Sequence, residues 1–124
     1  SDSKMLLARA IQMFMPGKPQ VWYLDLFAGK NDHEAVRRAG ESGHKEINRT
    51  NLSASDIREA LKKDVVAKQL ELLRMRNTHK AFEKGAVITV AEEGQKLSIR
   101  YDNGGAYALL TVDFEAGAYE IELS

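Results

Sequence analysis

Three cationic side chains lie close together in one polar, glycine-punctuated stretch, residues 40–52. His44 and Lys45 are adjacent, and Arg49 follows four residues later. A guanidinium group offers paired donors that fit two neighbouring sugar hydroxyls or a phosphate, and its neighbours add further positive charge. These residue types suit a ligand that offers paired hydroxyl groups or a phosphate. The alternative is a solvated surface loop with no ligand.

Other chemistries find less support in the sequence. The chain has no cysteine, which excludes disulfides and thiolate chemistry. His33, His44 and His79 do not fall, together with carboxylates, at the spacing of metal ligands on one helix face. We therefore expect no metal site.

The composition is that of an ordinary globular protein, with 44% hydrophobic and 29% charged residues among 124. Eighteen basic residues balance eighteen acidic ones, so net charge does not favour nucleic acid or an anionic membrane. The apolar stretch Met5–Met15 is interrupted and is shorter than the roughly 20 residues that span a bilayer. We expect no nucleic-acid or membrane partner and a cytoplasmic location.

Two elements are predicted before the cationic loop. Apolar residues recur at three- and four-residue steps from Lys4 to Met15, and Pro16-Gly17 follows, which predicts a helix. Gln20–Leu26 is short and rich in aromatic and apolar residues, which predicts a nearly buried strand of the parallel kind. Asn31-Asp32 predicts the cap of a short helix that runs through Ala39; the alternative is that these residues face a substrate.

Two further patterns follow the loop. Helical spacing continues from Ile57 to about Asn77, after a capping sequence at Ser53, and predicts one long amphipathic helix. Beyond Gly85 the period changes to two, and turn residues separate four runs, which predicts an antiparallel meander. The predicted strands are Ala86–Ala91, Leu97–Tyr101, Ala106–Val112 and Ala118–Leu123.

The predicted strand at 20–26 has no parallel partner within this sequence, which suggests a piece of a larger α/β body. The same strand and the apolar face of the first helix would then lack cover. We therefore expect a homodimer, with an interface through Leu6, Phe14, Val21 and Tyr23.

Several motifs follow one another in a distinctive order along the chain. The first is the stretch from Ala8 to Tyr23, with its Pro-Gly-Lys-Pro. The others, in order, are Ala28-Gly-Lys-Asn-Asp32, Glu46-Ile-Asn-Arg-Thr-Asn51, Asp64-Val-Val66 and Arg74-Met-Arg-Asn77 leading to Ala81-Phe82. The first motif resembles the last helix–strand step of the (β/α)8 barrel of the α-amylase-type enzymes, and the whole series resembles their sucrose phosphorylase branch. The resemblance implies an α+β fold, with the last helix–strand–helix segment of a barrel in residues 1–84 and a small antiparallel β domain in residues 85–124.

The resemblance also implies a reaction. In this family a carboxylate attacks the glucosyl C1, a second carboxyl group protonates the leaving sugar, and phosphate or another acceptor then takes the glucosyl group. Neither a metal nor an organic cofactor takes part. The catalytic carboxylates would lie on earlier barrel strands, before Ser1, so the chain alone should be inactive.

Finally, the resemblance implies roles for four residues. Arg49 matches the loop arginine that helps to hold the donor glucose. His44 and Lys45 would suit a phosphorylated sugar, as in the sucrose 6'-phosphate phosphorylase members. Asp25, at the strand end where barrel active sites gather, would contact the sugar or make a structural hydrogen bond.

Two other interpretations stay open. The chain could be a non-catalytic sugar-binding or assembly module whose functional surface is the β meander. It could also be a gene remnant or a cloned domain without activity of its own.

Overall fold

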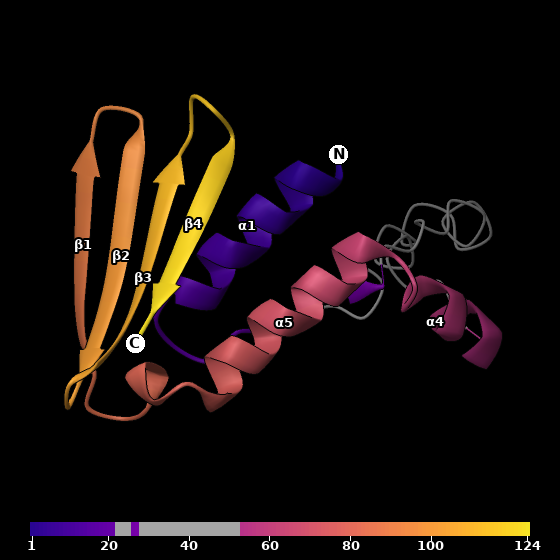
Figure 1. Cartoon of the computed structure of the whole chain (residues 1–124), viewed down its shortest axis with the longest axis horizontal. Coiled ribbons are helices and arrows are strands. Elements are labelled where there is room, and N and C mark those ends of the chain that lie inside the picture. The colour runs from indigo at the N-terminus through magenta and orange to yellow at the C-terminus, as the bar shows by residue number, and fades with distance from the viewer. Residues whose placement is uncertain (22–25, 28–52) are drawn as a thin grey trace, which may run out of the picture. The chain divides into compact units, whose positions relative to one another are not determined.

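A computed structural model describes residues 1–21, 26–27 and 53–124 (Figure 1). Two compact units divide the chain, one made of Ser1–Pro19 with Gln69–Ser124, the other of Gln20–Lys68. The described helices are α1 (Asp2–Phe14), α4 (Ala54–Ala60), α5 (Asp64–Thr78) and the short 3-10 helix η2 (Lys80–Phe82). The strands are β1 (Val87–Glu93), β2 (Lys96–Asn103), β3 (Ala106–Asp113) and β4 (Ala118–Leu123).

Helix α1 confirms the predicted helix to within two residues at its start and one at its end. Its buried side chains are Ala10, Met13 and Phe14, which lie on the face that the apolar spacing defines. The chain leaves the helix in an extended conformation at Met15. Gly17 then takes a φ of 95°, a left-handed conformation that glycine adopts without a steric penalty.

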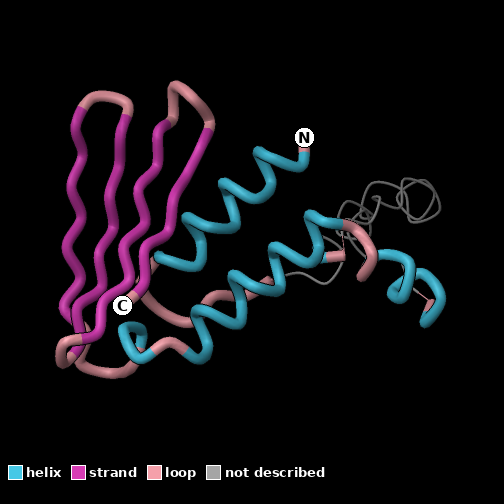
Figure 2. Tube along the Cα trace, in the orientation of Figure 1, coloured by secondary structure: helices cyan, strands magenta, loops and turns pink. Residues whose placement is uncertain are grey.

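The four strands form one antiparallel sheet in the order β1-β2-β3-β4, visible as the magenta strands of Figure 2. This confirms the predicted meander. The β2–β3 hairpin turns at Gly104 and Gly105, whose φ values of 56° and 89° explain the glycine pair. Helices and an antiparallel sheet agree with the α+β prediction, while the barrel segment stays a prediction.

The core of the first unit lies between α1, η2 and one face of the sheet. Alternate residues of β2 and β3 are buried there, namely Ile99, Tyr101, Ala108, Leu110 and Val112. Helix α1 lies on β3 and β4, and η2 lies on β2 and β3. The ring of Phe14 meets Phe82 edge-on at 5.3 Å and Tyr101 at 6.0 Å between centroids, so an aromatic cluster joins the helices to the sheet.

The single long helix predicted for Ile57–Asn77 is wrong, because residues 61–63 separate α4 from α5. The N–H groups of Lys62 and Lys63 donate three residues back, to Glu59 and Ala60, and this tightens the end of α4. Asp64 then begins a new helix, where a carboxylate is favoured by the helix dipole. The apolar spacing runs on in phase across the break, so periodicity did not reveal it.

Most of the predicted strand Gln20–Leu26, the short helix beginning near Asn31 and the cationic loop lie outside the described residues. Leu26 itself is helical, which corrects the prediction there. A helical turn satisfies backbone groups locally, whereas a strand without partners cannot. The predicted domain boundary after residue 84 stays a prediction.

Candidate functional site

The four predicted sugar-binding residues lie in the parts of the chain that the structure does not describe. Asp25 falls within 22–25, and His44, Lys45 and Arg49 fall within 28–52. Their mutual geometry therefore stays a prediction. The structure does describe the end of α1 and the residues up to Val21, from which the chain enters the first of these segments.

Arg76 of α5 binds the end of α1 and the turn that follows it through hydrogen bonds to backbone carbonyls. Its Nη1 donates to the carbonyl of Met13 at 3.1 Å, and its Nη2 donates to the carbonyl of Gly17 at 2.6 Å. The Tyr101 hydroxyl accepts from Nη1 at 3.0 Å and donates to the carbonyl of Phe14 at 2.9 Å. The last carbonyls of a helix have no partner within it, so these contacts supply what α1 lacks.

The guanidinium group of Arg76 is also held between two aromatic rings. It lies 4.9 Å from the centroid of Phe82 and 5.2 Å from that of Tyr101. A planar cation that stacks on rings and donates along its edge keeps one orientation. Arg76 entered the sequence analysis only as part of the motif Arg74-Met-Arg-Asn77, so its role as a link between α1, α5 and β2 was missed.

A second polar link within the same unit joins α1 to α5 through a buried amide. Gln69 is fully buried, and its Oε1 accepts from Nε of Arg9 at 2.9 Å. Arg9 also donates through Nη1 to Gln12 on its own helix. A buried amide must find partners, and these contacts fix the register of the two helices.

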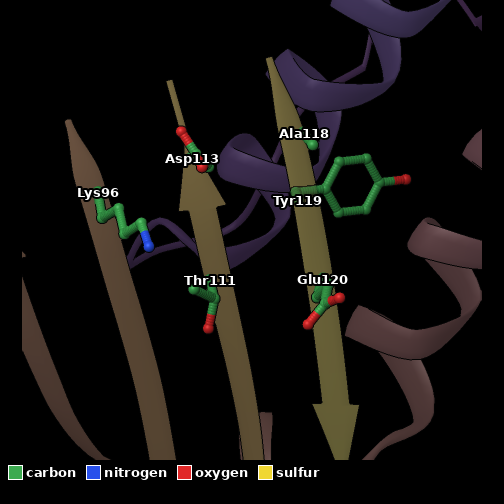
Figure 3. Close-up of a pocket in the computed structure, with 6 residues that line it drawn as sticks. All are labelled: Lys96, Thr111, Asp113, Ala118, Tyr119 and Glu120. Carbon is green, nitrogen blue, oxygen red and sulfur yellow. The ribbon is translucent and has the colours of Figure 1, made fainter. Parts of the chain in front are cut away.

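The solvent-facing side of the sheet has a shallow hollow of about 290 Å³ (Figure 3). Lys96 of β2 and Asp113 of β3 lie opposite each other at one end of it, and Thr111 and Glu120 form another facing pair. In Figure 3, the Tyr119 ring points away from Lys96. One cation, two carboxylates and a hydroxyl could hydrogen-bond a neutral polyol.

Further along the same face, Arg100 is held in place by two neighbours. Its Nε donates to the carboxylate of Asp102 at 3.0 Å, and its guanidinium lies 4.5 Å from the centroid of Tyr107. Both charged side chains are about two-fifths exposed, at 41% and 46%, so the pair contributes little to stability. It contributes a fixed polar group to this surface.

Within the described ranges, no three His, Cys, Asp or Glu side chains come together as metal ligands would. His79 instead caps η2, because its Nδ1 accepts from the N–H of Ala81 at 3.1 Å. No described helix is long and apolar enough to cross a membrane.

Known proteins resemble the chain over nearly its whole length, although no family model matches it. It is 52% identical over 121 residues to a sucrose 6(F)-phosphate phosphorylase of Ilumatobacter coccineus, a match that covers 98% of this chain and 23% of that protein. An enzyme of the same name from Thermoanaerobacterium thermosaccharolyticum is 49% identical over 81 residues, which cover 65% of this chain and 16% of that protein.

A solved structure agrees with these matches. This chain matches the crystal structure of sucrose 6F-phosphate phosphorylase from Thermoanaerobacter thermosaccharolyticum with a TM-score of 0.89 and 35% sequence identity. The match covers 99% of this chain and 24% of the enzyme chain in that crystal structure. The chain is thus homologous to the sucrose phosphorylase-type enzymes, which confirms the resemblance drawn from its motifs. Among these relatives, it is similar to the sucrose 6(F)-phosphate phosphorylases. It spans between 16% and 25% of the length of the curated relatives it matches.

Proposed function

We propose that this chain supplies one segment of a retaining α-glucosyl-transferring phosphorylase that acts on sucrose or sucrose 6'-phosphate. The observation that carries the proposal is 52% identity across nearly the whole chain to an enzyme of that name. The TM-score of 0.89 to a solved enzyme of the same kind supports it. A cytoplasmic location is part of the proposal.

Four residues have roles in this proposal. Arg49 holds the donor glucose by paired hydrogen bonds from its guanidinium group. Lys45 and His44 face the phosphate of a phosphorylated sugar, where positive charge is favoured. Asp25 contacts the sugar or orients a neighbour through a structural hydrogen bond.

The catalytic carboxylates of the proposed enzyme lie outside this chain. One attacks C1 of the glucosyl group, the bond to the leaving sugar breaks as the other donates its proton, and phosphate then displaces the enzyme carboxylate. Without those groups the chemical route is absent, so the chain alone is inactive.

We therefore predict that the purified chain releases no glucose 1-phosphate from sucrose or sucrose 6'-phosphate. A matched positive sample is a chimera in which this chain replaces the 121 matched residues of the Ilumatobacter enzyme. The chimera should release glucose 1-phosphate. Release of glucose 1-phosphate by the chain alone, above a blank without protein, would overturn the proposal that the catalytic carboxylates lie outside this chain.

A non-catalytic sugar-binding module is the second candidate, and the hollow of Figure 3 favours it. In that case the chain would bind a glycan with unchanged affinity after Arg49→Ala and with reduced affinity after Lys96→Ala. Isothermal titration with sucrose and short α-glucans separates the two candidates. If Arg49→Ala lowers the affinity and Lys96→Ala does not, the phosphorylase segment is favoured.

A further inference from the structure

The β2–β3 hairpin carries a chemically labile dipeptide, Asn103-Gly104. Of the five asparagines in the sequence, Asn103 alone is followed by glycine. An asparagine side chain can react with the backbone nitrogen of the next residue, and glycine has no Cβ to hinder that approach. This dipeptide is therefore the one in the sequence most open to spontaneous deamidation.

The fold uses the same asparagine as a link between the sheet and η2. Nδ2 of Asn103 donates to the carbonyl of Lys80 at 3.2 Å and to the carbonyl of Glu83 at 3.0 Å. Lys80 begins η2 and Glu83 follows its last residue, so the asparagine serves carbonyls at the end of a short helix. An amide nitrogen carries two hydrogens, and both are used here.

These contacts and the strand itself restrain the reaction. Asn103 is the last residue of β2 and pairs with Ala106. To close a ring, the side chain must fold back onto the nitrogen of Gly104, and the residue must leave the dihedral angles of a strand. The hairpin end must therefore open, and both hydrogen bonds of the amide must break. Gly104 and Gly105 are exposed, so water reaches the opened turn.

We propose that Asn103 is a modification site at which spontaneous deamidation removes the link between the hairpin and η2, and that the fold slows this reaction by holding the amide. The backbone nitrogen of Gly104 attacks Cγ of Asn103 and loses its proton. The bond from Cγ to the side-chain nitrogen breaks, and ammonia leaves. Water then opens the cyclic imide at one of its two carbonyls, which gives aspartate or isoaspartate. Water is the only co-reactant.

The product cannot make the link. An ionised carboxylate has no hydrogen to donate, and at residue 103 it would face two carbonyl oxygens. The ammonium group of Lys80 lies near the turn, 3.9 Å from the place of a Cβ on Gly104, and it can offset part of the added negative charge. It does not replace the two hydrogen bonds that the amide donated.

Mass spectrometry tests the site and its protection. The chain is kept in mildly alkaline buffer with and without denaturing urea, and its peptides are scored for asparagine, aspartate and isoaspartate. Asn77, exposed on α5 and followed by Thr78, is the internal reference. In urea, Asn103 should react about tenfold faster than Asn77, and without urea about tenfold more slowly than in urea. Equal rates for the two residues in urea would overturn the site, and equal rates for Asn103 in both samples would overturn the protection.

Two variants test the link to η2. His79→Ala removes the side chain that caps η2 and should raise the rate at Asn103 without urea about threefold. An unchanged rate, or a rise that Asn77 shares, would count against the proposal. Asn103→Asp mimics the product and should lower the urea midpoint of unfolding. Gln95→Glu makes the same change of amide to carboxylate in the exposed β1–β2 turn and is the control. Equal midpoints for the two variants would overturn the loss of the link.

Discussion

Among single residues, Arg76 makes the described contacts that most clearly join separate elements. It donates to backbone carbonyls of Met13 and Gly17 and stacks against Phe82 and Tyr101. A lysine there can offer one compact ammonium group and no planar fork. The end of α1 therefore depends on an arginine, and a positive charge alone is not a substitute.

We predict that Arg76→Lys lowers the free energy of unfolding by about 2 kcal/mol, because charged hydrogen bonds to backbone carbonyls are lost. Urea unfolding followed by circular dichroism measures the change. Arg74→Lys is the matched control, since Arg74 is exposed on the same helix and such surface changes stay within about 0.5 kcal/mol. Equal effects of the two substitutions would show that the contacts of Arg76 are unimportant.

Lys45 and Arg49 should differ in which substrates they affect in the active chimera. Arg49→Ala should impair every donor, because glucose is common to all of them. Lys45→Ala should lower kcat/KM for sucrose 6'-phosphate by an amount equal to about 1.5–3 kcal/mol, the range for a charge-assisted hydrogen bond, and spare sucrose. Equal losses on the two donors after Lys45→Ala would remove its assignment to phosphate.

Among the elements, α4 begins with a capping box that the sequence indicated at Ser53. The backbone N–H of Ser53 donates to the carboxylate of Asp56 at 3.0 Å, and the Ser53 hydroxyl accepts from the N–H of Asp56 at 3.1 Å. The hydrogen bond from the Ser53 backbone, followed by that with its side chain, lowers the pKa of Asp56.

Because the pKa of Asp56 is lower in the folded chain, its ionised form stabilises the fold above the unfolded pKa of about 4, and this contribution is lost as the pH falls through the folded value. We predict that Asp56→Asn is destabilising at pH 7, and that its difference from the wild type shrinks below about pH 4. Unfolding measured at both pH values checks this. A difference independent of pH would mean that the charge of Asp56 does not contribute.

For the whole molecule, self-association stays a prediction, but the structure narrows the residues that can take part. Phe14 is fully buried against Phe82 and Tyr101, so it belongs to the core of one copy. Leu6 and Val21 are half-buried, and Tyr23 lies outside the described residues.

We predict that the chain forms a dimer at micromolar concentration and that Leu6→Glu shifts it toward monomer, since a carboxylate in an apolar interface is costly. Light scattering gives the mass. Phe14→Ala should instead lower the free energy of unfolding by about 3–5 kcal/mol, as core truncation does. A wild-type monomer with a cooperative unfolding transition would contradict the dimer.

Helices and strands were predicted well from the sequence where one face of the element is buried and the other is exposed. Helix α1 and strands β2 and β3 follow from the period of their apolar residues, because one face of each of these elements is buried. Strands β1 and β4, which bury no residue, follow from their alternation and from the turn residues beside them. The resemblance of the chain to the sucrose phosphorylase-type enzymes, which the comparisons confirm, also came from its motifs. The roles of Arg49, Lys45, His44 and Asp25 rest on those motifs alone.

The contacts that join the elements to one another were seen only in the folded chain. Several hydrogen bonds join residues that are far apart in the sequence: Arg76 and Met13 are separated by 63 residues, Arg9 and Gln69 by 60, and Tyr101 and Phe14 by 87. The break at residues 61–63 was likewise invisible, because the apolar positions remain in phase across it. Periodicity records which side of an element is buried, and it carries no information about which distant backbone groups a polar side chain will satisfy.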